Sequence, residues 1–162
     1  MANTYTQIHL HMVVAVKGRL CLIPTEHAAM LYRYITGIVT QQGQKLLATN
    51  GMPDHVHLLI GFRPEKALSD LMREVKASSS KFINEQGWLM GKFSWQEGFG
   101  AFSYGASQLS AVISYIERQQ EHHATRTFKE EYLSLLDSFG IAYNAAYVFT
   151  APDEEPLINP AQ

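Results

Sequence analysis

The 162-residue chain contains one cysteine, Cys21, and no apolar run approaching the roughly 18–20 residues that a membrane-spanning helix needs. A single cysteine cannot form an intrachain disulfide, which favours a reducing compartment. The first residues form neither the basic nor the apolar segment of a secretion signal. With 46% hydrophobic residues, 6 prolines and 11 glycines, the composition excludes a disordered or collagen-like chain. We therefore expect a cytoplasmic globular protein with no membrane partner.

An excess of positive charge is also lacking, because 13 Lys and Arg residues face 15 Asp and Glu residues, for a net charge of −2. This balance excludes a uniformly basic protein that coats nucleic acid, since phosphate binding requires Lys and Arg. The charge is unevenly distributed, however: residues 1–96 carry +4 and residues 97–162 carry −6. This asymmetry permits a local basic surface, although ordinary solvated charge explains the counts equally well.

The length fits one domain with one core, and no internal repeat or long linker divides the chain. Residues 151–162 combine three acidic residues with three prolines and lack a core-forming pattern. We predict a single domain over residues 1–150, followed by an acidic, Pro-containing C-terminal tail over residues 151–162.

Hydrophobic periodicity and turn residues predict a β-α-β-β-α-β order followed by further helices. This order is typical of an α+β protein with a ferredoxin-like split βαβ antiparallel sheet, helices on one face, and additional C-terminal helices. The expected strands cover residues 8–16, 45–50, 55–60 and 101–104, and the expected helices cover about residues 25–42, 67–85, 107–123 and 128–138.

Two histidines, His55 and His57, lie on the third predicted strand. Side chains alternate along a strand, so both rings project from the same face, with Cα atoms roughly 6–7 Å apart. Two neutral imidazoles on one face can bind a single cation and leave positions open for other ligands. A purely structural role is the alternative, because His9 and His11 have the same spacing. The Pro53-Asp turn before the pair and the hydrophobic run after it distinguish the second pair from the first.

Tyr115 and Gln119 lie four residues apart on the third predicted helix and therefore share a face, which His122 extends by one turn. A tyrosine, whose ordinary pKa is about 10, is a poor nucleophile unless a nearby cation lowers the barrier. The carbonyl of a glutamine can offer its oxygen to a hard cation. The alternative is that Tyr115, one of eight tyrosines, only packs in the core. For His122 and His123 the default expectation is that they are solvated residues at the end of the helix.

Together these segments resemble the single-tyrosine HUH transposases of the insertion-sequence 200/605 type. HUH stands for His, a bulky hydrophobic residue and His, which His55-Val56-His57 matches. The family carries its nucleophile on a later helix as Tyr-x-x-x-Gln, which Tyr115 and Gln119 match. The likeness covers about residues 4–150 and extends to residues 8–19, 95–99 and 121–131.

The resemblance implies an HUH transposase-like catalytic domain that cuts and rejoins single-stranded DNA, with hairpin-bearing element ends as partners in a prokaryotic cytosol. Tyr115 would attack the scissile phosphate, leaving a 5′-phosphotyrosine and a free 3′-OH, so that strands can be rejoined without ATP. His55, His57 and Gln119 would hold Mg²⁺ or Mn²⁺. Mg²⁺ favours oxygen ligands, which makes Mn²⁺ a plausible activator beside two imidazoles. The resemblance also implies a homodimer whose active sites are shared between subunits.

Basic residues in two segments could contact the DNA. Lys17 and Arg19 follow the first predicted strand, and Arg73 and Lys76 lie on the second predicted helix. The alternative for Arg73 and Lys76 is that they lie on an ordinary solvent-exposed face of the helix and do not contact DNA.

Two other functions are consistent with the same residues. A metal-dependent phosphoesterase would use the His pair to activate water, and would remain active after Tyr115→Phe. A ferredoxin-like nucleic-acid-binding domain without catalysis would bind DNA or RNA regardless of a chelator.

Overall fold

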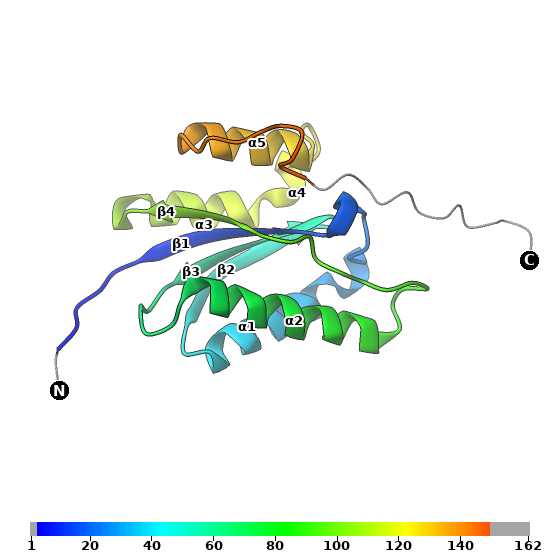
Figure 1. Ribbon diagram of the computed structural model, residues 1–162, viewed down its shortest axis with the longest axis horizontal. Helices are drawn as coiled ribbons and strands as arrows, with labels where there is room; N and C mark the ends of the chain where they lie inside the picture. Colours follow the sequence, from blue (N-terminus) through cyan, green and yellow to red (C-terminus); the bar gives the residue numbers. More distant parts are fainter. Residues whose placement is uncertain (1–2, 150–162) are drawn as a thin grey trace, which may run out of the picture.

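The computed structural model describes residues 3–149 and contains a four-stranded sheet, which lies between two layers of helices (Figure 1). Every strand pairs antiparallel with its neighbours, in the order β2-β3-β1-β4. This order confirms the predicted α+β class and split βαβ sheet. The strands are β1 His9–Ala15, β2 Lys45–Met52, β3 His55–Gly61 and β4 Gly100–Tyr104.

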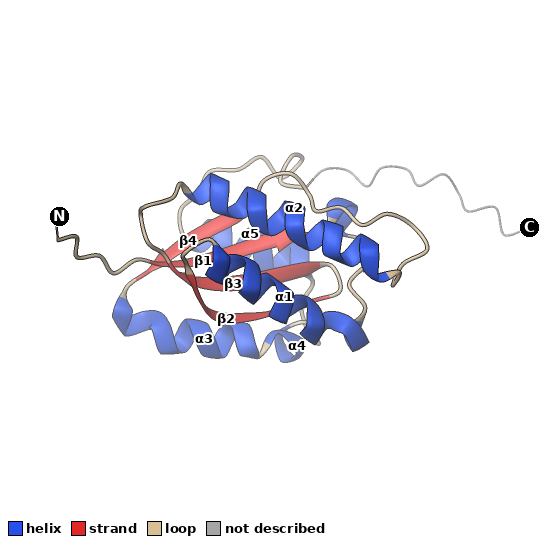
Figure 2. Ribbon diagram, turned by 90° about the horizontal axis from the view of Figure 1, so that it is seen from below, coloured by secondary structure: helices blue, strands red, loops and turns tan. Residues whose placement is uncertain are grey.

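Helices cover both faces of the sheet (Figures 1 and 2). The expectation of helices on one face holds only for the split βαβ unit, because the C-terminal helices close the opposite face. The first layer consists of α1 Ala28–Gln41 and α2 Leu68–Gln86, and the second consists of α3 Leu109–Glu117, α4 Gln119–His122 and α5 Phe128–Ser138.

Strand β3 is buried along almost its whole length. Because side chains alternate between the two faces of a strand, its residues contribute to two different hydrophobic clusters. Val56, Leu58 and Ile60 join the main core under α1 and α2. Leu59, on the other face, packs with Val112 and Ile116 of α3. The face that carries Leu59 also carries the two histidines, so the C-terminal helices enclose them.

The turn between β2 and β3 brings the two strands unusually close at Gly51. A Cβ atom at this position would lie 2.2 Å from the backbone oxygen of His55, which only glycine avoids. The pairing places Met52 of β2 and Ala15 of β1 on either side of His55. The first histidine is therefore fixed between two strands at the start of β3.

The predicted third helix is broken in the structure. Its backbone leaves helical geometry at Arg118, where φ is −100° and ψ is 26°, so that α3 ends at Glu117 and α4 begins at Gln119. The acidic tail predicted over residues 151–162 lies outside the described residues. No helix in the described part of the chain is long and apolar enough to cross a membrane.

Candidate active site

Strand β3 presents His55 and His57 on the sheet face beneath the C-terminal helices. Both side chains are 0% exposed, and their ring centroids lie 5.0 Å apart. Val56 between them points into the opposite core. The two imidazoles therefore share one face, as their spacing predicts, but this face is enclosed.

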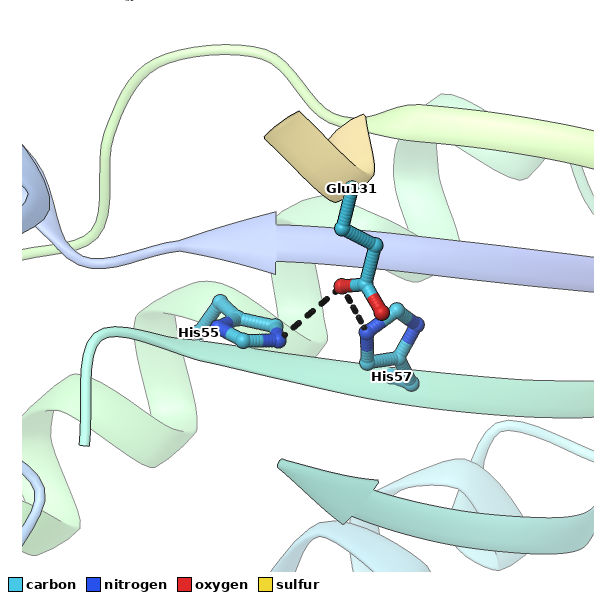
Figure 3. Close-up of side chains that lie close together, drawn as sticks. All are labelled: His55, His57 and Glu131. Carbon is cyan, nitrogen blue, oxygen red and sulfur yellow. Dashed lines mark hydrogen bonds and ion pairs between the residues drawn. The ribbon is translucent and has the colours of Figure 1, made fainter. Parts of the chain in front are cut away.

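Both imidazoles are directed at the carboxylate of Glu131, a residue to which the sequence motifs gave no role (Figure 3). Its Oε1 lies 2.9 Å from Nε2 of His57 and 3.3 Å from Nε2 of His55. Glu131 is 1% exposed and belongs to the first turn of α5. The signal that could have identified it is its position between Phe128 and Leu135, at the spacing of a buried helix face. A carboxylate on that face requires polar partners.

Tyr115 and Gln119 reach the same carboxylate from the third predicted helix. The hydroxyl of Tyr115 donates a short hydrogen bond to Oε2 of Glu131, and Nε2 of Gln119 donates to the same oxygen over 3.1 Å. The remaining amide oxygen of Gln119 lies 3.0 Å from Nε2 of His55. Tyr115 and Gln119 therefore both reach the site although the helix breaks between them at Arg118. The two residues meet the His pair and Glu131 within one chain.

The outer nitrogen of each imidazole also has a partner. Nδ1 of His55 lies 2.7 Å from Oδ1 of Asp54, and Nδ1 of His57 lies 2.7 Å from Nε2 of His11. Contacts of this kind hold a metal-binding histidine in orientation. The spacing of His9 and His11 was the reason to consider a purely structural role for a His-x-His pair. In the structure, His11 is itself buried and contacts the site through His57. Phe128 stacks on His55 with ring centroids 4.0 Å apart.

Burial and charge shift the pKa values of these groups in different directions. Burial alone would raise the pKa of Glu131, but hydrogen bonds from His55 and His57 hold it well below its usual range. Burial raises the pKa of Tyr115, and the neighbouring carboxylate of Glu131 raises it further. Burial also lowers the pKa of His11 to about 3. The site thus holds an anionic carboxylate, a protonated phenol and a neutral His11.

The donor set fits a divalent cation. Ligand atoms of His55, His57 and Glu131 lie within 4.8 Å of one another, and the amide oxygen of Gln119 adjoins them. Imidazole nitrogen suits transition metals, whereas carboxylate and amide oxygens also suit Mg²⁺ and Mn²⁺. A cation is the natural partner for a buried anionic carboxylate.

The four basic residues expected at DNA lie on other surfaces and do not reach this cluster. Lys17 and Arg19 form a short helical turn after β1, where the guanidinium of Arg19 lies 4.7 Å from the ring centroid of Phe149. Arg73 is 69% exposed and pairs with Asp70. Lys76 donates hydrogen bonds of 2.6 Å to two backbone carbonyls, those of Gln96 and Gly98, which occupies two of its three donors.

Arg73 and Lys76 line a groove of about 690 Å³ between α2 and the segment that leads to β4. Lys81 and Lys92 also line it, against one carboxylate, that of Glu97. The residues that line the groove therefore carry more positive than negative charge. The net charges of the whole chain and of residues 1–96 do not indicate where this charge lies.

The family described as "Transposase IS200 like" matches residues 4–119, which include the His pair, Tyr115 and Gln119. The chain belongs to the IS200-like transposase family. The family match ends at Gln119 and thus before α5, so it does not extend to Glu131.

Individual members of the family are more distant in sequence. The chain is 26% identical over 122 residues to the ISDra2 transposase TnpA of Deinococcus radiodurans, covering 71% of this chain and 86% of that protein. A crystal structure of a candidate transposase from Deinococcus radiodurans R1 superposes with a TM-score of 0.58 at 26% identity, over 74% of this chain and 96% of the other.

A further solved structure, a REP-associated tyrosine transposase bound to a REP hairpin, superposes with a TM-score of 0.58. It is 17% identical and covers 76% of this chain and 73% of the other. At that identity the likeness concerns the fold alone.

Proposed function

We propose that this IS200-like transposase cuts and rejoins single-stranded DNA through a covalent link to Tyr115. The observation that carries the proposal is the convergence of the Tyr115 hydroxyl and the imidazoles of His55 and His57 on one buried carboxylate, that of Glu131. A nucleophile and a phosphate-activating centre must lie this close together for direct attack on phosphorus.

In the proposed step, the phenolic oxygen of Tyr115 forms a bond to the scissile phosphorus and the bond from phosphorus to the 3′ oxygen breaks. The phenolic hydroxyl, which its hydrogen bond to Oε2 of Glu131 orients, gives up its proton as the bond to phosphorus forms. Overall, that one proton moves from Tyr115 to the departing 3′ oxygen, which leaves as a hydroxyl, and the 5′-phosphate stays on the tyrosine. The diester is thereby conserved, so attack by another 3′-OH reverses the step and rejoins the strands.

His55, His57, Gln119 and Glu131 would hold the divalent cation, Mg²⁺ or Mn²⁺. When bound, the cation supplies charge that polarises the phosphate. The raised pKa of Tyr115 keeps its hydroxyl protonated at neutral pH until DNA and cation are in place. The residues of the chain orient the cluster and exclude water, since the His pair and Glu131 are fully buried.

The DNA contacts belong to this proposal as well. We assign the groove along α2, with Arg73 and Lys76, to the phosphate backbone, and the turn with Lys17 and Arg19 to the strand near the site. Because Lys76 is held by two backbone carbonyls, it offers one donor and fixes the loop that forms the groove. Hairpin-bearing ends are the proposed substrate, since the fold binds a hairpin in the REP-associated transposase.

The homodimer implied by the resemblance stays a prediction. The resemblance implies that Tyr115 meets the His pair of a second subunit, whereas in the structure it contacts Glu131 of its own chain. We therefore propose that each site is complete within one chain, whether or not two chains associate.

Labelled single-stranded oligonucleotides with hairpins, incubated with the protein and Mn²⁺ or Mg²⁺ and separated on a denaturing gel, test the proposal. We expect a DNA–protein adduct that is lost in Tyr115→Phe and His57→Ala and kept in Tyr147→Phe, a change at an exposed tyrosine. An adduct that survives Tyr115→Phe would refute the assignment. Cleavage without any adduct, unchanged in Tyr115→Phe, would instead support the phosphoesterase, and chelator-insensitive binding without cleavage would support the binding domain.

A further inference from the structure

Strand β2, which borders the strand of the His pair, carries a polar side chain that the site described above does not include. This residue, Asn50, is paired directly across from His57 of β3. Directly opposite residues of two antiparallel strands project from the same face of the sheet. The side chain of Asn50 therefore points toward the C-terminal helices, as that of His57 does.

The amide of Asn50 caps the end of α3. Its Nδ2 lies 3.1 Å from the carbonyl oxygens of Ile116 and Glu117, which are the last two residues of that helix. The last carbonyls of a helix have no partner within the helix, so Asn50 supplies one from the sheet. Because backbone carbonyls only accept hydrogen bonds, this contact also fixes which end of the amide faces α3.

Gln120, the second residue of α4, holds the amide of Asn50 in this orientation. The two side chains are hydrogen-bonded in both directions, with Nδ2 of Asn50 3.0 Å from Oε1 of Gln120 and Nε2 of Gln120 3.1 Å from Oδ1 of Asn50. Nε2 of Gln120 also lies 3.3 Å from the carbonyl oxygen of Gly51. Both sides of the break at Arg118 are therefore attached to two adjacent residues of β2.

Apolar contacts also hold α3 on the sheet, but they constrain it differently. Val112 and Ile116 pack with Leu59 of β3 and keep α3 against the sheet. Such contacts are not directional, so they do not define where along the sheet the helix ends. Hydrogen bonds are directional, so those of Asn50 define this position.

We propose that Asn50, held by Gln120, is a positioning residue that keeps the hydroxyl of Tyr115 at the His pair. Tyr115 lies one residue before the first carbonyl that Asn50 binds, and its ring centroid lies 6.0 Å from that of His57, the strand partner of Asn50. One amide thus connects the strand of the His pair with the helix of the nucleophile. The proposal rests on the proposed function, in which Tyr115 attacks the phosphate.

Single-turnover kinetics distinguish positioning from DNA binding. The rate constant of adduct formation is measured at saturating Mn²⁺ and saturating hairpin oligonucleotide, and the affinity for the oligonucleotide is measured by fluorescence anisotropy with a chelator present. We compare the wild type with Asn50→Ala and Gln120→Ala. Gln44→Ala is the matched control, because Gln44 also makes two amide hydrogen bonds to backbone, those to Arg63, just before the other end of β2. Circular dichroism melts establish that each variant is folded.

We expect Asn50→Ala to lower the rate constant by roughly 10–100-fold at unchanged oligonucleotide affinity, because a displacement of about 1 Å can cost roughly 100-fold. Gln120→Ala should lower it by a smaller factor, since the contacts of Asn50 with α3 remain, and Gln44→Ala should keep the wild-type rate constant. Equal rate constants in Asn50→Ala and Gln44→Ala would overturn the proposal. A weaker oligonucleotide affinity with an unchanged rate constant would also overturn it, because Asn50 would then contact DNA.

Hydrogen exchange, followed by mass spectrometry, tests the attachment of α3 without catalysis. Asn50→Ala should raise amide exchange in peptides from α3 and α4, and not in those from α2, whereas Gln44→Ala should leave all three unchanged. Unchanged exchange of α3 and α4 in Asn50→Ala would overturn the proposal while leaving the proposed function standing. A wild-type adduct that survives Tyr115→Phe would instead refute the proposed function, and with it any role of Asn50 in the reaction.

Discussion

Glu131 is the residue on which the account of the site depends most, because the His pair, Tyr115 and Gln119 all contact it. We expect Glu131→Gln, which removes the negative charge, to weaken Mn²⁺ binding by at least about 10–100-fold. Isothermal titration calorimetry measures this directly. Glu130→Gln is the matched control, since a glutamine at this position preserves the capping interaction with Thr127. Equal Mn²⁺ affinity in the two variants would show that Glu131 does not hold the cation.

His11 gives a prediction about pH. Burial lowers its pKa from 6.5 to about 3 in the folded protein, so below pH 6.5 the unfolded chain binds a proton that the folded chain does not. Protonation of His11 therefore does not lower the free energy of unfolding above pH 6.5. As the pH falls from 6.5 toward 3, it lowers that free energy by up to about 1.4 kcal/mol per pH unit.

We expect the acid-side decrease in the free energy of unfolding to become shallower by up to that amount in His11→Asn. Urea unfolding between pH 6.5 and 4, in the presence of a chelator, measures the slope. His9→Asn, on the same strand but only partly buried, should keep the wild-type slope. If His11→Asn keeps it too, then His11 takes up its proton in the folded state as readily as in the unfolded chain.

At the scale of elements, α5 determines the position of Glu131. The helix begins at Phe128 after Thr127, whose hydroxyl accepts a hydrogen bond from the amide of Glu130. Thr127→Ala removes this cap and should cost about 1 kcal/mol. The corresponding decrease in melting temperature is about 2–4 °C for a protein of this size, measured by calorimetry.

Because α5 carries Glu131, the same change should also weaken Mn²⁺ binding. Thr125→Ala is the control, since Thr125 lies in the preceding turn and caps no helix. A destabilised Thr127→Ala protein with unchanged metal affinity would show that the order of α5 does not determine the site.

The sequence predicted the elements of the split βαβ unit closely, because strong periodicity and turn residues mark each boundary. It also placed His55 and His57 on one face and Tyr115 with Gln119, since these relations depend only on local geometry. The helical spacing indicates that Glu131 lies on the buried face of α5, but not that this face meets the His pair. Glu131 was missed because that contact forms only when α5 folds over the sheet. The break at Arg118 was missed for a similar reason, because Arg118 itself favours helix.

His123 was assigned to solvent by the same local reasoning. His122 does share the face of Tyr115, since the two rings stack with centroids 4.7 Å apart. His123 lies four residues after Gln119 and contacts both Gln119 and Glu131. The contact with Glu131 forms only when α5 packs over α4, so the local pattern did not indicate it.

At the scale of the whole molecule, the arrangement of subunits can be tested by mixing inactive variants. When Tyr115→Phe and His57→Ala proteins are mixed, a site shared between subunits would recover adduct formation, because the intact Tyr115 of one chain meets the intact His57 of the other. A site within one chain predicts that the mixture remains inactive. We expect no recovery, because Tyr115 contacts Glu131 of its own chain. Recovery to a substantial fraction of wild-type adduct, after refolding the mixed chains together, would favour the shared site.

The net charge of −2 is also a property of the whole molecule, and it conceals the basic groove along α2. Arg73→Ala should reduce the affinity for a hairpin oligonucleotide and lower the salt dependence of binding by about one phosphate contact. Fluorescence anisotropy over a range of salt concentrations measures both. Arg33→Ala, on α1, is the control for loss of one positive charge, and an identical effect of the two changes would exclude a specific contact in the groove.

Mass spectrometry of the digested adduct shows directly whether Tyr115 becomes covalently bound to the 5′-phosphate of cut DNA. We expect one modified peptide, in which Tyr115 carries the 5′-phosphate, together with a released strand that ends in a free 3′-OH. A modification on any other residue would show that Tyr115 is not the nucleophile, and a 3′-phosphate linkage would show that the opposite bond of the phosphodiester breaks.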